Sequence, residues 1–104
     1  DAHALLVPTT SLFSEGLNKV AVEGVLAGRA TVVSRMTNAR DVLGDAVVEV
    51  REGDVAGYAA ALERLADDEA WFERVRAAGA AVRGRFFDAS HGWAAAVERA
   101  LEAA

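Results

Sequence analysis

Residues 4–34, ALLVPTTSLFSEGLNKVAVEGVLAGRATVVS, contain the pattern that decides the fold. A short apolar run at 4–7 stops at a proline, and a loop rich in Ser and Thr follows. A mostly apolar segment at 17–27 leads to a second, Val-containing run at 31–34. Short apolar runs bounded by turn residues are typical of buried parallel strands, and the longer segment between them has the length of a helix. The stretch therefore predicts a strand, a helix and a second strand.

The same alternation continues once more after residue 34. Asn38 is a candidate cap for a short helix ending at Leu43, and residues 46–50 predict a third strand. Strands and helices that alternate in this way form parallel sheets with right-handed crossovers. Because a doubly wound sheet usually has about five or six strands, residues 1–53 predict the second, site-bearing half of a Rossmann-type domain.

The remaining residues, 54–104, are rich in Ala, Glu and Arg, as long helices are. Three helices are expected there, over 55–65, 69–85 and 93–103. Asp54 is a candidate cap for the first of them, and Asp88 or Ser90 for the last. The predicted fold class is therefore α/β: a partial Rossmann-like domain with about three parallel strands followed by C-terminal helices.

Composition excludes several classes of function. The chain has 104 residues, of which 11 are basic and 16 acidic, and the net charge of −5 lacks the basic footprint of a nucleic-acid-binding protein. It contains no Cys, so disulfides, thiolate metal sites and a cysteine nucleophile are excluded. Neither a membrane-spanning run nor a signal peptide is visible, which favours a cytoplasmic location. Because the first residue is Asp rather than Met, we expect a fragment or a processed product.

The start of the first predicted helix is a candidate anion site. Ligands of open α/β sheets bind beyond the carboxyl ends of the strands, where the loop that ends at Gly16 is expected. Gly16 allows the backbone to approach a ligand closely, and the amides of Leu17 and Asn18 are donors at a helix start. Such a start suits a phosphate or diphosphate, and Lys19 adds positive charge.

Two glutamates flank this helix start. The neighbours of Glu23 are apolar or small, and a carboxylate in such surroundings is costly unless it is hydrogen-bonded. The adjacent hydroxyls of a ribose suit it, because an ionised carboxylate only accepts. Glu23 lies on the order of 9 Å along the axis from the predicted helix start, so a diphosphate at the start and a ribose beside the second turn could both fit. Glu15 would then reach a sugar on the other side of the diphosphate. Alternatively, Glu15 is simply favourable at a helix start, and Glu23 pairs with a buried amide or with Arg29.

Glu15 and Glu23 are separated by seven residues, within flanks that share the order and spacing of one known family. The matching flanks are Val7-Pro8-Thr9, 11–16, 26–34, 42–46, 52–55, the Ala and Leu positions 60, 62 and 65, and 86–93. Over essentially its whole length the chain resembles the donor-binding part of GT-B glycosyltransferases, especially the large retaining family numbered four.

The resemblance implies that residues 1–104 are the C-terminal part of a nucleotide-sugar-binding domain in a hexosyltransferase-type enzyme. By analogy, Glu15 contacts the donor sugar and is the catalytic candidate. The amides of Gly16, Leu17 and Asn18 then hold the diphosphate, and Glu23 bonds the ribose. No metal or other cofactor is expected, because a helix dipole and basic side chains stabilise the leaving diphosphate. The partners implied are a nucleoside-diphosphate sugar and a sugar or lipid-linked acceptor.

The chain also departs from the family. Thr37-Asn38 stands where a Gly-Gly pair is usual, Ala30 where Pro is usual, and Gly24 where Ala is usual. The resemblance places the acceptor domain and the diphosphate-neutralising Arg and Lys before Asp1, so we expect the chain alone to be inactive. A sheet of three strands leaves an exposed edge, which favours pairing with the missing N-terminal half or with a second copy in a homodimer.

Other interpretations stay open. The runner-up is a non-catalytic α/β interaction module with a degenerate site. The segments that flank the two glutamates resemble a GT-B epimerase or phosphorylase less well. A phosphorylase also needs a lysine that holds pyridoxal phosphate, and the sole lysine of the chain, Lys19, lies at the predicted phosphate position.

Two further groups of residues are also open to more than one interpretation. Four arginines and four aromatic residues cluster late in the chain: Arg74, Arg76, Arg83, Arg85, Trp71, Phe72, Phe86 and Phe87. They indicate either a solvated Arg face with aromatic anchors or a surface that docks on the missing domain or on the inner face of a membrane. His3 and His91 are expected at the surface rather than at a metal, and Ser90 as a cap rather than a nucleophile.

Overall fold

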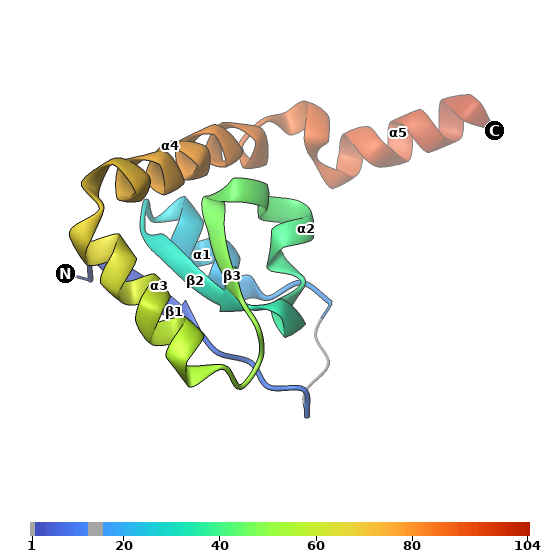
Figure 1. Cartoon of the computed structure of the whole chain (residues 1–104). Coiled ribbons are helices and arrows are strands. Elements are labelled where there is room, and N and C mark those ends of the chain that lie inside the picture. The colour runs from blue at the N-terminus through green and yellow to red at the C-terminus, as the bar shows by residue number, and fades with distance from the viewer. Residues whose placement is uncertain (1, 13–15) are drawn as a thin grey trace.

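The structure, a computed structural model of the chain, describes residues 2–12 and 16–104 (Figure 1). Three strands, β1 (Ala4–Val7), β2 (Ala30–Ser34) and β3 (Val47–Val50), form one parallel sheet in the order β1-β2-β3. Ala4 lies beside Ala30, and Thr31 lies beside Val47. This arrangement confirms the predicted Rossmann-like α/β fold.

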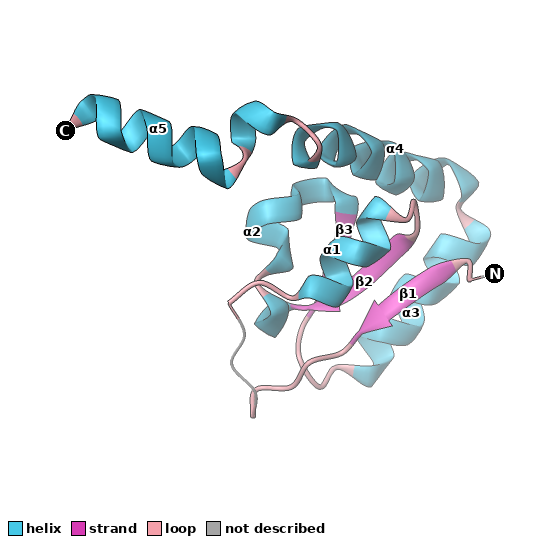
Figure 2. Cartoon of the chain, turned by 180° about the vertical axis from the view of Figure 1, so that it is seen from behind, coloured by secondary structure: helices cyan, strands magenta, loops and turns pink. Residues whose placement is uncertain are grey.

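Helices cover both faces of the sheet and its amino end (Figures 1 and 2). The helices are α1 (Lys19–Leu26), α2 (Ala39–Leu43), α3 (Val55–Asp67), α4 (Glu69–Phe86) and α5 (Trp93–Ala103), with 3-10 turns η1 (Arg35–Thr37), η2 (Gly44–Ala46) and η3 (Ala89–His91). Helices α1 and α2 lie on one face and α3 on the other, while α4 crosses the amino ends of the strands. Helix α5 extends away from the rest of the molecule and has no buried residue.

The two faces of the sheet have separate cores. The core on the α1 side consists of Val7, Ala21, Val25, Val33, Ala39, Leu43, Ala46 and Val47. The core on the α3 side consists of Ala30, Val32, Val50, Tyr58, Ala61, Leu65 and Val75. Successive side chains of a strand point to opposite faces, so Val32 and Val33 enter different cores.

Capping side chains set the starts of two helices. The Oδ1 atom of Asn18 accepts a hydrogen bond from the Ala21 N–H at 2.9 Å, so α1 begins at Lys19, two residues later than predicted. The Oδ1 atom of Asp54 accepts from the Gly57 N–H at 2.9 Å, which confirms Asp54 as the cap of α3.

Two other predicted caps are wrong. Asn38 precedes α2, but its side chain makes no capping bond, and the Thr37 hydroxyl accepts from the Ala39 N–H at 3.2 Å instead. Asp88 caps η3, where its Oδ1 atom accepts from the Ser90 N–H at 2.9 Å. Gly92 therefore precedes α5, which has no side-chain cap. The turn η3 separates Asp88 from α5, whereas Asn38 directly precedes α2 but has a left-handed backbone, with φ of 54°.

Gly24 lets α1 lie close to the sheet. A Cβ atom at this position would stand 2.5 Å from Leu5 Cδ2 and 2.7 Å from Thr31 Oγ1. The Leu5 side chain is partly buried and its end can move, but Thr31 is fully buried and its hydroxyl donates to the Arg29 carbonyl oxygen at 3.1 Å. This contact is a physical reason for Gly where the glycosyltransferase pattern has Ala.

We expect Gly24→Ala to lower the free energy of unfolding by about 1–3 kcal/mol, because the added methyl overpacks the interface between α1 and the sheet. The matched control is Gly84→Ala in α4, where a Cβ would meet nothing within 4 Å. That control should gain up to about 1 kcal/mol from helix propensity. Urea unfolding followed by circular dichroism measures both changes, and a Gly24→Ala protein as stable as the original contradicts the close approach.

Candidate functional site

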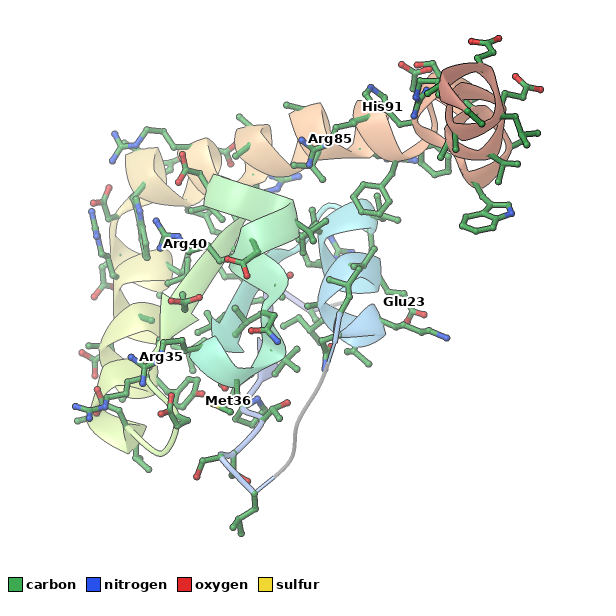
Figure 3. The ribbon with its side chains drawn as sticks, turned by 90° about the vertical axis from the view of Figure 1, so that its right-hand side faces the viewer. Glu23, Arg35, Met36, Arg40, Arg85 and His91 are labelled. Carbon is green, nitrogen blue, oxygen red and sulfur yellow. The ribbon has the colours of Figure 1, made fainter. Side chains whose placement is uncertain are left out.

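The carboxyl ends of the three parallel strands meet at one edge of the sheet. Three segments leave the strands there: the loop that leads to α1, the turn η1 after Ser34, and the residues that follow Val50. Ligands of open α/β sheets bind at this edge. Figure 3 labels Arg35 and Met36 on η1 and Glu23 on α1. The sequence-predicted site residues that the structure describes lie in or directly after the first of these segments.

The start of α1 is open to solvent. Gly16, Leu17 and Lys19 are exposed, whereas Asn18 is buried by its capping role. The cap satisfies one amide of the first turn, and the amides of Lys19 and Val20 have no acceptor within the helix. The structure thus brings Gly16, Leu17 and Asn18 together at a helix start beside the strand ends. Their binding of a diphosphate stays a prediction.

The structure describes Glu23 but not Glu15, the other glutamate of the predicted site. Glu15 lies outside the described residues, and its contact with a donor sugar stays a prediction. Glu23 is exposed and points outward from α1 (Figure 3). The expectation that burial forces its carboxylate to find a partner is therefore wrong. The face of α1 that packs on the sheet carries Ala21, Gly24 and Val25, so apolar neighbours in sequence did not enclose Glu23.

Buried hydroxyls shape the turn after β2. The Ser34 hydroxyl accepts from the Met36 N–H at 2.9 Å, and the Thr37 hydroxyl donates to the Ser34 carbonyl oxygen at 2.8 Å. Ser34 and Thr37 are both fully buried, so these bonds hold the turn from within. Sequence analysis did not single them out, although the spacing of three between two small hydroxyl residues after a strand is typical of such a turn.

Asn38 has a left-handed backbone, with φ of 54°. Asn is one of the few residues besides Gly that adopts this conformation readily. It occupies the second position of Thr37-Asn38, which stands where the resembled family has Gly-Gly. The substitution therefore keeps a backbone conformation that favours glycine.

An ion pair joins the turn after β2 to the turn after β3. The Arg35 guanidinium lies 2.9 Å from the Glu52 carboxylate, whose side chain is one-fifth exposed. A hydrogen bond from its own backbone N–H and the Arg35 guanidinium lower the pKa of the Glu52 carboxyl. Sequence analysis missed both residues, although each closely follows the end of a strand.

The Tyr58 hydroxyl is a further buried polar group at this edge. Tyr58 belongs to the core on the α3 side, and its hydroxyl oxygen is buried. Burial raises the pKa of Tyr58, and the nearby Ser34 hydroxyl is a smaller, opposing influence. The tyrosine is therefore neutral at physiological pH.

The cluster of arginines and aromatic residues forms separate pairs. Arg64 stacks over Trp71 at 3.9 Å, and Arg76 lies 5.6 Å from the Phe72 ring. Trp71 and Phe72 pack against the core on the α3 side, as aromatic anchors do. This arrangement favours the interpretation of a solvated Arg face with Trp71 and Phe72 as anchors, whereas Phe87 is 71% exposed and is not an anchor.

The two histidines also have protein contacts. His3 stacks on Phe72 with ring centroids 4.2 Å apart. The Nε2 atom of His91 lies 3.8 Å from Asp88 Oδ2, while the Ser90 hydroxyl donates to Asp88 Oδ1 at 2.8 Å. Because the serine hydroxyl bonds to the carboxylate rather than to the imidazole, these residues are not arranged as a nucleophile and its base.

Residues 2–12 and 16–104 contain neither a membrane-spanning helix nor a cluster of metal ligands. In that part of the chain, no helix combines the length and apolar character needed to cross a bilayer. The same residues contain no group of three or more His, Cys, Asp or Glu side chains that could hold a metal ion.

No known family, no curated protein and no solved structure matches the chain.

We expect Arg35→Ala to raise the midpoint at which the Glu52 carboxyl titrates, because one stabiliser of the charged form is lost while the backbone bond remains. The folded-state pKa lies below the unfolded one, so the carboxylate stabilises the fold at neutral pH and loses this effect as pH falls through the folded pKa. Carboxyl resonances followed by NMR measure the midpoint. Arg64→Ala should leave it unchanged, and an Arg35→Ala protein with the original midpoint contradicts the assignment.

Proposed function

We propose that the chain is the C-terminal, donor-binding part of a hexosyltransferase-type glycosyltransferase that takes a nucleoside-diphosphate sugar. The observation that carries the proposal is the placement of Gly16, Leu17 and Asn18 at a solvent-open helix start beside the strand ends, with Glu23 exposed on the same helix. This placement supports a site for an anion flanked by hydroxyl groups.

The diphosphate is the first element of the proposed complex. The helix dipole and the amides of the first turn attract an anion, and Lys19 is exposed beside them. Arg35 is already paired with Glu52. Besides Arg35, the described part of this edge carries Lys19 at the start of α1 and Arg51 after β3, whereas the resemblance places the cations that neutralise the diphosphate in another part of the protein. We therefore propose that the chain alone does not transfer sugar.

The ribose is the second element. Glu23 lies one turn into α1, about 6 Å along the axis from Lys19 at the usual rise per residue. An exposed, ionised carboxylate accepts hydrogen bonds from two adjacent hydroxyls. Its exposure makes it accessible to a ligand that lies along the outer side of α1.

The sugar is the third element, and Glu15 and the turn at Asn38 are the proposed contacts. The left-handed backbone of Asn38 supports this, since glycine, which is usual there in the resembled family, adopts the same conformation readily. Transfer then requires stabilisation of the departing diphosphate by the helix start as the bond to the sugar breaks. A cytoplasmic location, with the acceptor brought by an upstream domain, belongs to the same proposal.

The second candidate is a non-catalytic α/β interaction module. It is favoured by the Arg35–Glu52 pair, which occupies two charged side chains at the strand ends that a catalytic site would use. An epimerase or phosphorylase of the same fold remains a further alternative.

Isothermal titration of the purified protein with UDP, GDP and ADP tests donor binding. We expect one of them to bind and Glu23→Gln to weaken it about tenfold or more, because a hydrogen bond to a charged group is lost. Glu63→Gln in α3 is the matched control and should bind as the original protein does. Failure of all three nucleotides to bind, or equal binding by Glu23→Gln, contradicts the proposal.

Release of nucleoside diphosphate by the complete gene product distinguishes an enzyme from an interaction module. We expect the complete gene product to release nucleoside diphosphate from the matching nucleotide sugar, and Glu15→Gln to bind the donor while losing this release. Binding without any release by the complete gene product favours the interaction module.

A further inference from the structure

Within the part of the chain that the structure describes, the outer edge of β3 has no neighbouring strand. In the sheet order β1-β2-β3, β3 pairs with β2 alone. Alternate N–H and C=O groups of an edge strand point outward, and no other segment of the described chain bonds to those of β3. Such an edge is a template for an added strand.

A cavity of about 520 Å³ lies at the amino end of this edge. Its charged residues near β3 are Arg40 of α2, Asp45 of η2 and Arg74 of α4. Asp45 lies 3.9 Å from Arg40, but its side chain is 91% exposed, so one oxygen remains open to solvent. The amino end of the edge therefore offers an accessible carboxylate and an accessible arginine, Arg74.

A second cavity of about 400 Å³ lies at the carboxyl end of the edge, between β3 and α3. Arg51, Asp54 and Arg64 contribute its charges near the strand end. Arg64 is engaged with Asp68 at 3.7 Å and with the Trp71 ring. One oxygen of Asp54 caps α3. The carboxyl end thus also offers one arginine, Arg51, and one carboxylate oxygen.

The two cavities share Val48, Glu49 and Trp71, so they adjoin each other along the strand. Val48 is partly buried and lies on the α3 side, in the middle of β3. The centre of the edge is therefore apolar on the α3 side, Glu49 is an acidic residue beside it that lines both cavities, and a charged pair stands at each end.

We propose that this edge pairs with the same edge of a second copy of the chain, antiparallel about a two-fold axis at Val48. The two sheets then form one sheet of six strands. The partner's Arg51 meets Asp45, and the partner's Asp54 meets Arg74. Each contact occurs twice by symmetry, and Val48 lies opposite the partner's Val48.

The charges select this orientation and this occupant. A parallel pair of edges would place Asp45 beside the partner's Asp45 and Arg74 beside the partner's Arg74, and like charges across a strand pair repel. An acidic peptide would meet Asp45 and Glu49, and a basic one would meet Arg51 and Arg74. The two-fold antiparallel pairing brings opposite charges together at both ends of the edge, and it forms a closed dimer.

Cross-linking tests the register. The chain has no natural Cys, so Val48→Cys introduces a single thiol. Opposed residues of an antiparallel pair have Cα atoms about 4.5–5.5 Å apart, within the range of a disulfide. Mild oxidation should convert Val48→Cys into a covalent dimer, whereas Leu62→Cys on α3 stays monomeric. Equal cross-linking by the two variants overturns the register.

Charge exchange tests the pairing at the ends. In sedimentation equilibrium we expect Asp45→Arg and Arg51→Glu each to weaken dimerisation about tenfold or more, through loss of attraction and new like-charge contacts. The double variant restores opposite charges and should recover dimerisation, and Arg83→Glu near the far end of α4 should have no effect. Circular dichroism checks that each variant is folded.

A protein that stays monomeric at millimolar concentration overturns the proposal, as does a double variant that stays as weak as the single ones. The outcome is independent of the proposed function, because neither Glu23 nor the start of α1 takes part in the edge. A variant that loses nucleotide binding but still dimerises, or one that binds nucleotide but no longer dimerises, separates the proposed function from the proposed dimer.

Discussion

The burial of β2 on both faces is the constraint on which the rest of the structure depends. All five residues from Ala30 to Ser34 are buried, and Val32 and Val33 enter different cores. A strand of this kind needs an apolar layer on each side, which α1 and α2 provide on one face and α3 on the other. Helix α4 then closes the amino end by packing against both cores. Among the residues that the structure describes, no helix crosses the carboxyl end of the sheet, and the loops lie there.

The same constraint explains the character of the candidate site. Because the strands are parallel, the segments that follow them come together at one edge, and their polar groups have to be satisfied there. The hydroxyls of Ser34 and Thr37 turn inward and hold η1. Arg35 reaches Glu52 across the strand ends. The start of α1 stays open, so it is the part of the edge best suited to receive a ligand.

Much of the fold could be predicted from the sequence, and the failures share one cause. The strand at 4–7, the order of strands and helices and the cap at Asp54 are confirmed, because each depends on residues that are close in sequence. The enclosed Glu23 and the caps at Asn38 and Asp88 are wrong. Apolar neighbours do not determine which face of a short helix meets the sheet. A 3-10 turn separates Asp88 from the last helix, and the left-handed backbone of Asn38 accompanies the missing cap of α2.

The sequence by itself determined the α/β class, the parallel order and the segment that carries the two glutamates, since apolar runs, turn residues and caps act over a few positions. Tertiary structure alone decided that Gly24 approaches Leu5 and Thr31, that Arg35 pairs with a residue 17 positions away, and that the edge of β3 is left free. These features depend on how helices rotate and settle against the sheet, and that packing is a property of the whole chain rather than of any local stretch.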